Sequence, residues 1–342
     1  MISADTIEHL LDTFASRSVT QSTDGALQGL MQKLIDSGFA GLPLPGQGRT
    51  LERWRTLAKV GACDLALTKI FEGHTDALAI VTELEPDRAP APGLWGVWAA
   101  EPSFARIEIV DRQDDQVYLQ GRKAWCSGAA ILDWALVTTW DEQGLAQLVA
   151  VDLKQASLSR VDEVWQAVGM AHTASVDVEF NGALGHCVGL PGQYVDRPGF
   201  WQGGGGIAAC WYGAACAFAG YLREHCTRPY HDAHAAAHLG AVDAALCAAA
   251  ASMRETAAWI DGHPQSSAEI PVRRLRAQVE AAVTVVLEQV GRALGATPYC
   301  RNAHFARLAA DLPVFLRQSH GHKDLAELGK RTAAQSIDGW LL

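Results

Sequence analysis

Several features that would mark a nucleic-acid-binding or zinc-binding protein are missing from this sequence. Its 342 residues include 28 Lys and Arg against 38 Asp and Glu, which gives a formal net charge of −10. No run of basic residues supplies the positive surface that nucleic-acid binding requires, so we expect no such partner. The eight cysteines form no CxxC pair and lie mostly among apolar residues, which is typical of buried free thiols rather than of disulfides or a zinc site.

Membrane and secretion signals are also lacking on inspection. We find no uninterrupted apolar stretch long enough to span a bilayer, and the opening MISADTIEHLLDTF has acidic residues where a signal peptide would be basic and then apolar. These observations predict a cytoplasmic protein with no membrane partner. The composition, 49% hydrophobic and 19% charged, is that of a soluble globular enzyme.

Hydrophobic spacing changes twice along the chain and predicts three domains. Residues 1–93 show helical spacing and end in the proline-rich segment EPDRAPAPG. Residues 94–191 contain short alternating apolar segments separated by turn-like DRQDDQ and NGALG, which indicates a β-domain. Residues 192–342 return to helical spacing, with one apolar stripe along PVRRLRAQVEAAVTVVLEQVGRAL. We therefore expect an α+β multidomain protein that ends in a helical bundle able to self-associate.

The segment GRKAWCSGA, Gly121 to Ala129, combines an indole with a hydroxyl between two predicted strands. Strict alternation along a strand would put Lys123, Trp125 and Ser127 on one face and the intervening residues on the other. An indole beside a hydroxyl suits a planar ligand with polar edges, because the ring can cover the ligand face while the hydroxyl reaches its edge. The alternative is a half-buried sheet surface on which the tryptophan only fills space.

Six segments, in this order, resemble motifs of the acyl-CoA dehydrogenase flavoprotein superfamily. They are GFAGLPLPGQG, GACDLALTKIFEGH, WAAEP, GRKAWCSGA, GMAHTASVDVEF and PGFWQGGGGIAACWYGAACAFAGYL. The resemblance implies an N-terminal α-helical domain, a central β-barrel or sandwich domain and a C-terminal four-helix bundle domain. It also implies an FAD-dependent oxidoreductase that forms a homodimer or homotetramer and acts on a small molecule such as an acyl-CoA.

The same resemblance assigns residues to the cofactor. In the family the Trp-x-Ser/Thr strand lies along the isoalloxazine of FAD, which implies that Trp125 lies beside the ring and Ser127 bonds near N5 and O4. Val97, Ala99 and Ala100 would line the flavin from the WAAEP strand. Ala100 replaces the threonine usual there, and the glycine-rich loop that normally follows is missing.

Gln289 completes the predicted cofactor contacts. It lies in EQVGRALG, which resembles the family's Q-x-x-G-G turn near the adenine of FAD, although Arg292 or Ala293 stands where the second glycine belongs.

Three histidines and an aspartate suggest a metal site at first sight: His231, Asp232, His234 and His238. His234 and His238 are one helical turn apart and can share a face. No further ligand with motif spacing follows, and the resemblance implies no metal, so we expect none.

The family's catalytic base is missing from its usual place. Dehydrogenases of the family commonly carry a Glu followed by Gly-Thr near the C-terminus, whereas counting on from Asp311 here reaches Ser319 and His320. Some relatives place the base on the first bundle helix beside a glycine pair, but that stretch reads FWQGGGG here and offers no Glu, and the usual substrate Arg aligns near Gly204. His320 is the candidate catalytic residue, because an imidazole titrates near neutral pH and some flavin monooxygenases of the superfamily have a histidine in this region. The alternative is a helix-end histidine in a polar turn with His322 and Lys323.

The glycine run from Gly203 to Gly206 has two interpretations. It could cradle a phosphate at the start of a helix, or it could make room for close packing against flavin or substrate. No Lys-Ser/Thr follows, so the run is not a P-loop.

Three functions fit these observations. The first is an FAD-dependent, acyl-CoA dehydrogenase-like oxidoreductase that acts on an acyl thioester or related carbonyl compound. Its catalytic base would be divergent, and Glu72 or Glu101 could take the place of the missing Glu. The second is a reduced-flavin-dependent monooxygenase on the same fold, with His320 as acid or base. The third is a catalytically silent family member that serves as a binding or assembly subunit.

Overall fold

The computed structural model describes residues 4–17, 24–162, 164–229, 233–335 and 340. Its α+β fold has about 57% of its residues in helices. Contacts divide the chain into two compact units. The first unit comprises Met1–Leu10, Thr20–Leu42 and Ala66–Phe200, and the second comprises Leu11–Val19, Pro43–Leu65 and Trp201–Leu342.

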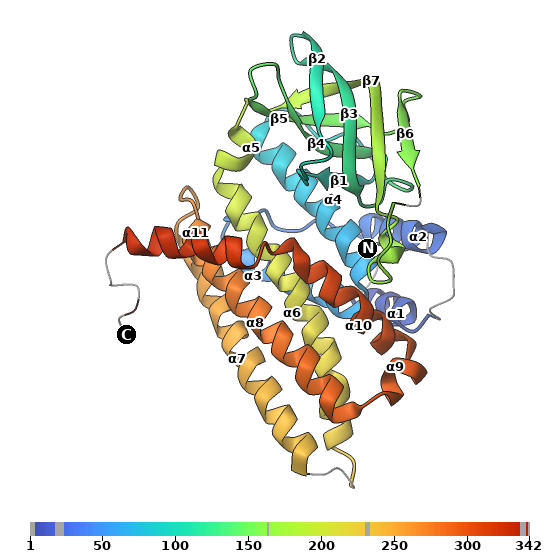
Figure 1. The fold of residues 1–342 in the computed structure, drawn as a ribbon, viewed down its shortest axis with the longest axis vertical. Helices are drawn as coiled ribbons and strands as arrows, with labels where there is room; N and C mark the ends of the chain where they lie inside the picture. The colour runs from blue at the N-terminus through green and yellow to red at the C-terminus, as the bar shows by residue number, and fades with distance from the viewer. Residues whose placement is uncertain (1–3, 18–23, 163, 230–232, 336–339, 341–342) are drawn as a thin grey trace. The chain divides into compact units, whose positions relative to one another are not determined.

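Helices precede and follow a continuous series of strands (Figure 1). The helices that precede the strands are α1 (Ala4–Ala15), α2 (Asp24–Asp36), α3 (Thr50–Cys63) and α4 (Leu65–Leu84). The strands are β1 (Trp95–Trp98), β2 (Ile107–Gln113), β3 (Gln116–Cys126), β4 (Trp134–Trp140), β5 (Ala146–Asp152), β6 (Leu158–Val161) and β7 (Val176–Val188). The helices that follow are α5 (Gln193–Asp196), α6 (Pro198–Cys226), α7 (Ala233–Gly262), α8 (Glu269–Leu294), α9 (Thr297–Arg301), α10 (Ala303–Phe315) and α11 (His322–Ala333).

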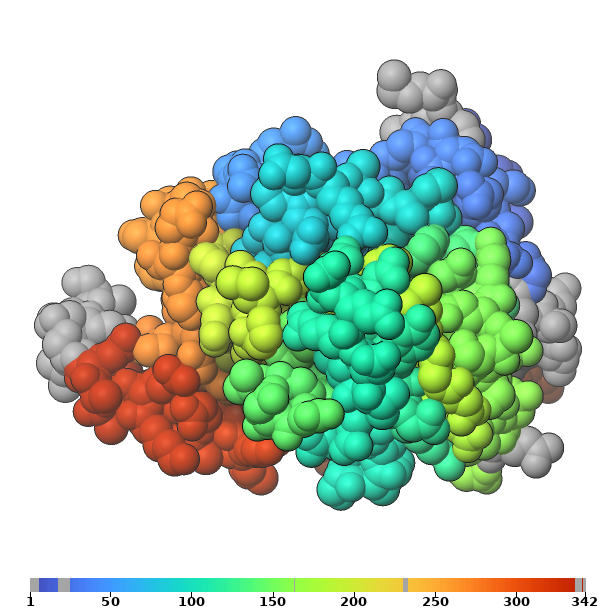
Figure 2. All heavy atoms as spheres, turned by 90° about the horizontal axis from the view of Figure 1, so that it is seen from above, coloured from blue at the N-terminus to red at the C-terminus, as the bar shows by residue number. Residues whose placement is uncertain are grey.

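Five of the strands close into a ring in the first unit. Strand β4 pairs with β2 and β5, β3 pairs with β2 and β7, and β7 pairs with β5. Strand β1 adds to β4 in parallel, and β6 adds to β7 in the antiparallel direction. In the space-filling view, the teal and green residues of this part of the chain lie side by side on one surface (Figure 2). The ring agrees with the predicted central β-barrel, while the domain boundaries at residues 93 and 191 and the four-helix bundle stay predictions.

Helix α4 covers the strands of the first unit with its apolar face. Ala77, Ile80 and Val81 pack in one buried cluster with Trp95 and Leu136 of the neighbouring strands. Residues three and four apart lie on one side of a helix, so this spacing turns the face toward the sheet. Burying such side chains stabilises the fold by about 1.5–3 kcal/mol each, and the packing fixes α4 against β1 and β4.

In the second unit, α8 buries the stripe that its spacing predicts. All six of its residues are buried: Val272, Leu275, Val279, Val283, Val286 and Val290. Helix α7 packs along α8. The predicted apolar face of this segment is therefore confirmed.

Two helices are long and apolar enough to cross a membrane by length and composition, which corrects the expectation that no such stretch exists. They are α6 and α7. The inspection for unbroken apolar runs missed them, because the glycine run in α6 and polar residues such as Asp243 in α7 interrupt the apolar segments. The most apolar window of α6 is 67% buried, as in the core helix of a globular protein, whereas that of α7 is 17% buried.

Candidate functional site

A β-bulge in β3 determines which side chains of GRKAWCSGA are exposed. Pairing with β7 runs as far as Lys123 opposite Val178 and resumes with Cys126 opposite Val176, so β3 has one extra residue there. Trp125 adopts a left-handed backbone with φ of 58°. Lys123 is fully buried, whereas Trp125 is 49% exposed. The prediction that both share a face is wrong, because strict alternation requires an unbulged strand.

The bulge presents Trp125 beside a second exposed aromatic ring. Phe104 is 69% exposed and meets Trp125 edge to face, with ring centroids 5.9 Å apart and an interplanar angle of 83°. Asp177, which is buried, accepts the Trp125 amide at 3.2 Å and pairs with Arg122 at 2.8 Å. The carboxylate therefore pins the backbone that carries the indole, and two aromatic faces are left open to a ligand.

Ser127 connects this surface to a buried series of hydroxyls. Its Oγ lies 2.8 Å from Oγ of Ser175, which lies 2.7 Å from Oγ1 of Thr173. The Thr173 hydroxyl donates to the carbonyl of Met170 at 2.7 Å. The half-buried end of the series is thus Ser127, next to Trp125, and the buried end is a backbone carbonyl.

The predicted flavin-lining residues of WAAEP lie close to the bulge. Val97 belongs to β1, Ala99 and Ala100 directly follow it, and all three are half-buried. Between them, Trp98 donates its Nε1–H to the carbonyl of Ser127 at 3.0 Å. The structure therefore brings these predicted cofactor residues together in the first unit, while their contact with a flavin stays a prediction.

Glu101 and Glu72 are carboxylates already paired with lysine. Glu101 accepts from Nζ of Lys123 at 2.6 Å, from the hydroxyl of Thr138 and from Nε1 of Trp140 at 3.1 Å. Burial alone would raise the pKa of Glu101, but these hydrogen bonds and the lysine charge outweigh it and lower the pKa below its usual value. Glu72 pairs with Lys69 in the same way. Both contacts favour a structural role over that of a missing base.

His74, at the end of the FEGH motif, is a titratable residue to which the sequence assigned no role. It is 3% exposed, and its Nδ1 accepts the amide of Trp95 at 3.2 Å. A ring nitrogen that accepts an N–H is unprotonated, so the proton of the neutral ring is on Nε2. Burial lowers the pKa of His74 to about 4. The side chain therefore ties α4 to β1 in its neutral form.

Acidification is expected to weaken the protein through His74. An unfolded histidine titrates near its ordinary pKa of 6.5, and the buried ring near 4, so the unfolded chain binds the proton first. Stability is complete above about pH 6.5 and is lost as the pH falls toward 4, by about 2 kcal/mol at pH 5. Urea unfolding of the wild type and of His74→Asn, whose amide oxygen can accept the same N–H, measures this. The variant is expected to lose less stability between pH 8 and pH 5, and equal losses would contradict the assignment.

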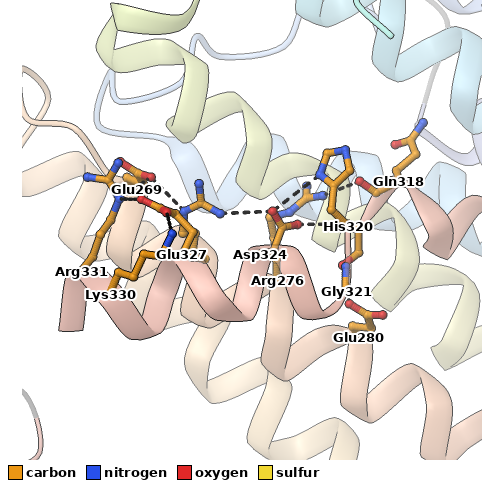
Figure 3. Close-up of polar contacts among 12 residues, drawn as sticks. Glu269, Arg276, Glu280, Gln318, His320, Gly321, Asp324, Glu327, Lys330 and Arg331 are labelled. Atoms are coloured by element: carbon orange, nitrogen blue, oxygen red, sulfur yellow. Dashed lines mark hydrogen bonds and ion pairs between the residues drawn. The ribbon is translucent and has the colours of Figure 1, made fainter. Parts of the chain in front are cut away.

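His320 lies in a turn before α11 in the second unit, where Asp324 contacts it twice (Figure 3). Asp324 accepts the His320 amide at 3.0 Å, and its carboxylate lies 3.6 Å from Nδ1 of the imidazole. Arg273 holds the same carboxylate at 3.2 Å. Burial alone would raise the pKa of Asp324, but the His320 amide and the nearby positive charges outweigh it and lower the pKa. The His320 side chain is 72% exposed, so it can reach a ligand.

Two residues of α8 next to this turn escaped the sequence analysis. Glu280 accepts the hydroxyl of Ser319 at 2.5 Å, which places a carboxylate beside the position where the family usually has Glu. Arg276 donates to the carbonyls of Gly204 at 3.0 Å and Gln318 at 3.2 Å. An arginine is therefore present beside Gly204, but it comes from another helix. The sequence feature that could have indicated Arg276 and Glu280 is their spacing of four, which puts both on one side of α8.

The glycine run serves close packing. It lies inside α6, one turn after the first residue, Pro198, so it does not form a helix terminus. A Cβ on Gly205 would lie 2.5 Å from the ring of Trp54, and one on Gly206 would lie 2.9 Å from Leu57. The interpretation of a phosphate cradle at the start of a helix is therefore wrong. Helix α3 requires the small size of Gly205 and Gly206, whereas a Cβ on Gly204 would meet nothing within 4 Å.

Gln289 lies on α8, where its Oε1 is 2.6 Å from Nδ1 of His238. This contact uses the histidine that the metal interpretation would need. His231 and Asp232 lie outside the described residues, and among the residues that are described no group of three His, Cys, Asp or Glu could hold a metal ion.

Comparison with known proteins relates the chain by fold. No family model and no curated protein matches the sequence. FMN-bound TdsC from Paenibacillus sp. A11-2 has a TM-score of 0.77 at 19% identity over 95% of each chain. Methanesulfinate monooxygenase MsuC from Pseudomonas fluorescens has a TM-score of 0.80 at 18% identity over 98% of each chain. A nitrososynthase from Micromonospora carbonacea var. africana has a TM-score of 0.79 at 16% identity over 96% of this chain and 94% of its own.

These similarities establish the fold and agree with the predicted superfamily at that level. TdsC is also described as a dibenzothiophene monooxygenase, and one of its structures contains FMN and indole.

Proposed function

We propose that this chain is a reduced-flavin-dependent monooxygenase that binds its flavin on the Trp125 surface of the first unit. The observation that carries the proposal is the exposed Trp125 and Phe104 pair beside the Ser127 hydroxyl. A flavin ring is planar, with an apolar face and polar edges, so an indole can stack on it while hydroxyl and backbone groups bond its rim. The residues present therefore fit an isoalloxazine.

The residues found where the family's catalytic Glu is missing favour oxygenation over dehydrogenation. Ser319 and His320 occupy the place of the usual Glu, while Glu72 and Glu101 are paired with lysines. In addition, the chain shares its fold over 95% of its length with FMN-bound TdsC, and both TdsC and MsuC are named monooxygenases. When bound, reduced flavin would supply electrons to molecular oxygen. The residue proposed to supply or accept the proton that oxygen transfer requires is His320.

Acyl-thioester dehydrogenation is the second candidate, because Glu280 and Asp324 lie beside Ser319 and His320. Either carboxylate could take the α-proton of an acyl substrate. FAD, predicted from the sequence, belongs to this candidate, whereas FMN is the flavin bound by TdsC. For both we propose a cytoplasmic homodimer or homotetramer with a small-molecule substrate and no nucleic-acid or membrane partner.

Flavin binding and turnover test the proposal. Purified protein is titrated with FMN and with FAD, first in the oxidised form and then, in the absence of oxygen, in the reduced form. It is then assayed for turnover with a flavin reductase, oxygen and one of three test substrates, which are indole, dibenzothiophene and methanesulfinate. Binding of reduced flavin and an oxygenated product support the monooxygenase. Bleaching of bound oxidised flavin by butyryl-CoA or octanoyl-CoA without oxygen supports the dehydrogenase. Failure to bind any flavin supports the catalytically silent alternative.

Replacing Trp125 with alanine is expected to weaken flavin binding by about 5- to 150-fold, since stacking on one aromatic ring contributes about 1–3 kcal/mol. Alanine meets the same left-handed backbone as tryptophan, so the bulge gains no new strain. Fluorescence titration with FMN measures the change. Trp340→Ala removes another exposed indole and is the control. Equal affinity in Trp125→Ala and wild type would place the flavin elsewhere.

A further inference from the structure

The hydroxyls of Ser127, Ser175 and Thr173 form a hydrogen-bonded series with a definite direction. Ser175 is 4% exposed and Thr173 is 1% exposed, whereas Ser127 is half-buried at the open end beside Trp125. The series ends inward at the carbonyl of Met170, to which Thr173 also donates its amide at 3.1 Å. Each hydroxyl has one proton to donate, so the fixed end determines what the open end can do.

The carbonyl of Met170 can only accept, so the bond of 2.7 Å uses the hydroxyl proton of Thr173. In the next bond, at 2.7 Å, Thr173 must therefore accept and Ser175 must donate. The last bond, at 2.8 Å, then requires Ser127 to donate to Ser175. The proton of Ser127 points into the protein, and its oxygen offers only lone pairs to a ligand.

We propose that this series makes the Trp125 surface selective for reduced over oxidised flavin. The inference rests on the proposed function. Oxidised flavin has an unprotonated N5 that accepts hydrogen bonds, whereas reduced flavin has an N–H there that donates. An acceptor-only Ser127 satisfies the reduced ring and leaves the oxidised ring facing lone pairs. Thr173 and Ser175 are therefore specificity-determining residues that act through Ser127.

The size of the preference follows from how the series could reverse. If Ser127 turned its proton outward, both bonds between the hydroxyls would reverse, so that Ser175 donates to Ser127 and Thr173 donates to Ser175. The Met170 carbonyl would then lose the hydrogen bond from the Thr173 hydroxyl but keep the one from the Thr173 amide. Reversal thus costs one net hydrogen bond, which corresponds to a preference of about fivefold for reduced flavin. For a two-electron couple this equals a rise of the bound flavin potential by about 20 mV, because the reduced form is the one stabilised.

The test compares dissociation constants for oxidised and oxygen-free reduced FMN in four proteins. Thr173→Val removes the fixed end and Ser175→Ala removes the inward acceptor, yet both keep the hydroxyl of Ser127. In each variant the ratio of oxidised to reduced dissociation constants is expected to fall about fivefold from its wild-type value. Ser159→Ala, which removes an exposed hydroxyl of β6, is expected to keep the wild-type ratio.

The outcomes separate this inference from the function on which it rests. If neither form of FMN or FAD binds the wild type, the proposed flavin site is wrong. If flavin binds but Thr173→Val and Ser175→Ala keep the wild-type ratio, the directed series is overturned while the flavin site stands. The potential of bound FMN is a second readout, and it is expected to fall by about 20 mV in both variants. Near-ultraviolet circular dichroism checks that each variant keeps its tertiary packing.

Discussion

Replacing His320 with glutamine is expected to lower the turnover of an oxygenated substrate by about 10²- to 10⁴-fold, which is the usual contribution of a positioned acid or base. Glutamine retains hydrogen-bonding groups but cannot carry a proton between donor and acceptor. The affinity for reduced FMN is expected to remain that of the wild type, because the Trp125 surface is unchanged. Product formation under saturating reduced FMN measures the rate, and fluorescence titration measures the affinity.

His322→Gln is the matched control, since His322 is an exposed histidine two residues away. Asp324→Asn tests the positioning of His320. Asparagine keeps an oxygen that can accept the His320 amide but removes the charge that lies 3.6 Å from Nδ1, so the turnover is expected to fall while the affinity for reduced FMN stays that of the wild type. A His320→Gln variant with wild-type turnover would remove His320 from the mechanism and direct attention to Glu280, which bonds the adjacent Ser319.

Gly213→Ala is expected to lower the free energy of unfolding by about 3 kcal/mol, the cost of overpacking a tight contact. A Cβ at Gly213 would lie 1.9 Å from the carbonyl oxygen of Ala58, where α6 and α3 meet backbone to backbone. A backbone atom cannot rotate away as a side chain can, so the helices must separate. Urea unfolding followed by circular dichroism measures the loss.

Gly220→Ala provides the control on the same helix. A Cβ there meets nothing within 4 Å, and the residue is exposed. Because alanine favours helix over glycine, this variant is expected to gain about 0.5–1 kcal/mol. If Gly213→Ala were as stable as Gly220→Ala, the close contact between α3 and α6 would not exist in solution.

Much of the fold follows from hydrophobic spacing. The stripe of α8 is buried as predicted, and the alternating segments of residues 94–191 form the strands, because periodic burial is a local property of sequence. Strand pairing is not local, so the ring of β4, β2, β3, β7 and β5 came from the family resemblance rather than from the residues. The composition of alanine-rich α7 does not predict how deeply it is buried, since small side chains suit both close packing and contact with solvent.

The candidate site was less predictable where chemistry depends on distant segments. The sequence predicts Trp125 and Ser127 as site residues, but it does not predict the bulge that separates Lys123 from them, because the bulge is set by pairing with β7. Asp324 is close to His320 in sequence, whereas Glu280 approaches the same turn from α8. Such neighbours cannot be derived from spacing within one element.

Because of the left-handed backbone at Trp125, the residue that would stabilise the fold most at this position differs from the residue that would bind a ligand best. Glycine would adopt that conformation without the penalty of about 1–2 kcal/mol that a side chain incurs, but it would remove the ring offered to the ligand. A laboratory selection for heat resistance alone would therefore tend to discard the indole. Thermostable descendants of this protein would need a parallel screen for cofactor retention, because the substitution most favourable to the chain is the least favourable to its ligand.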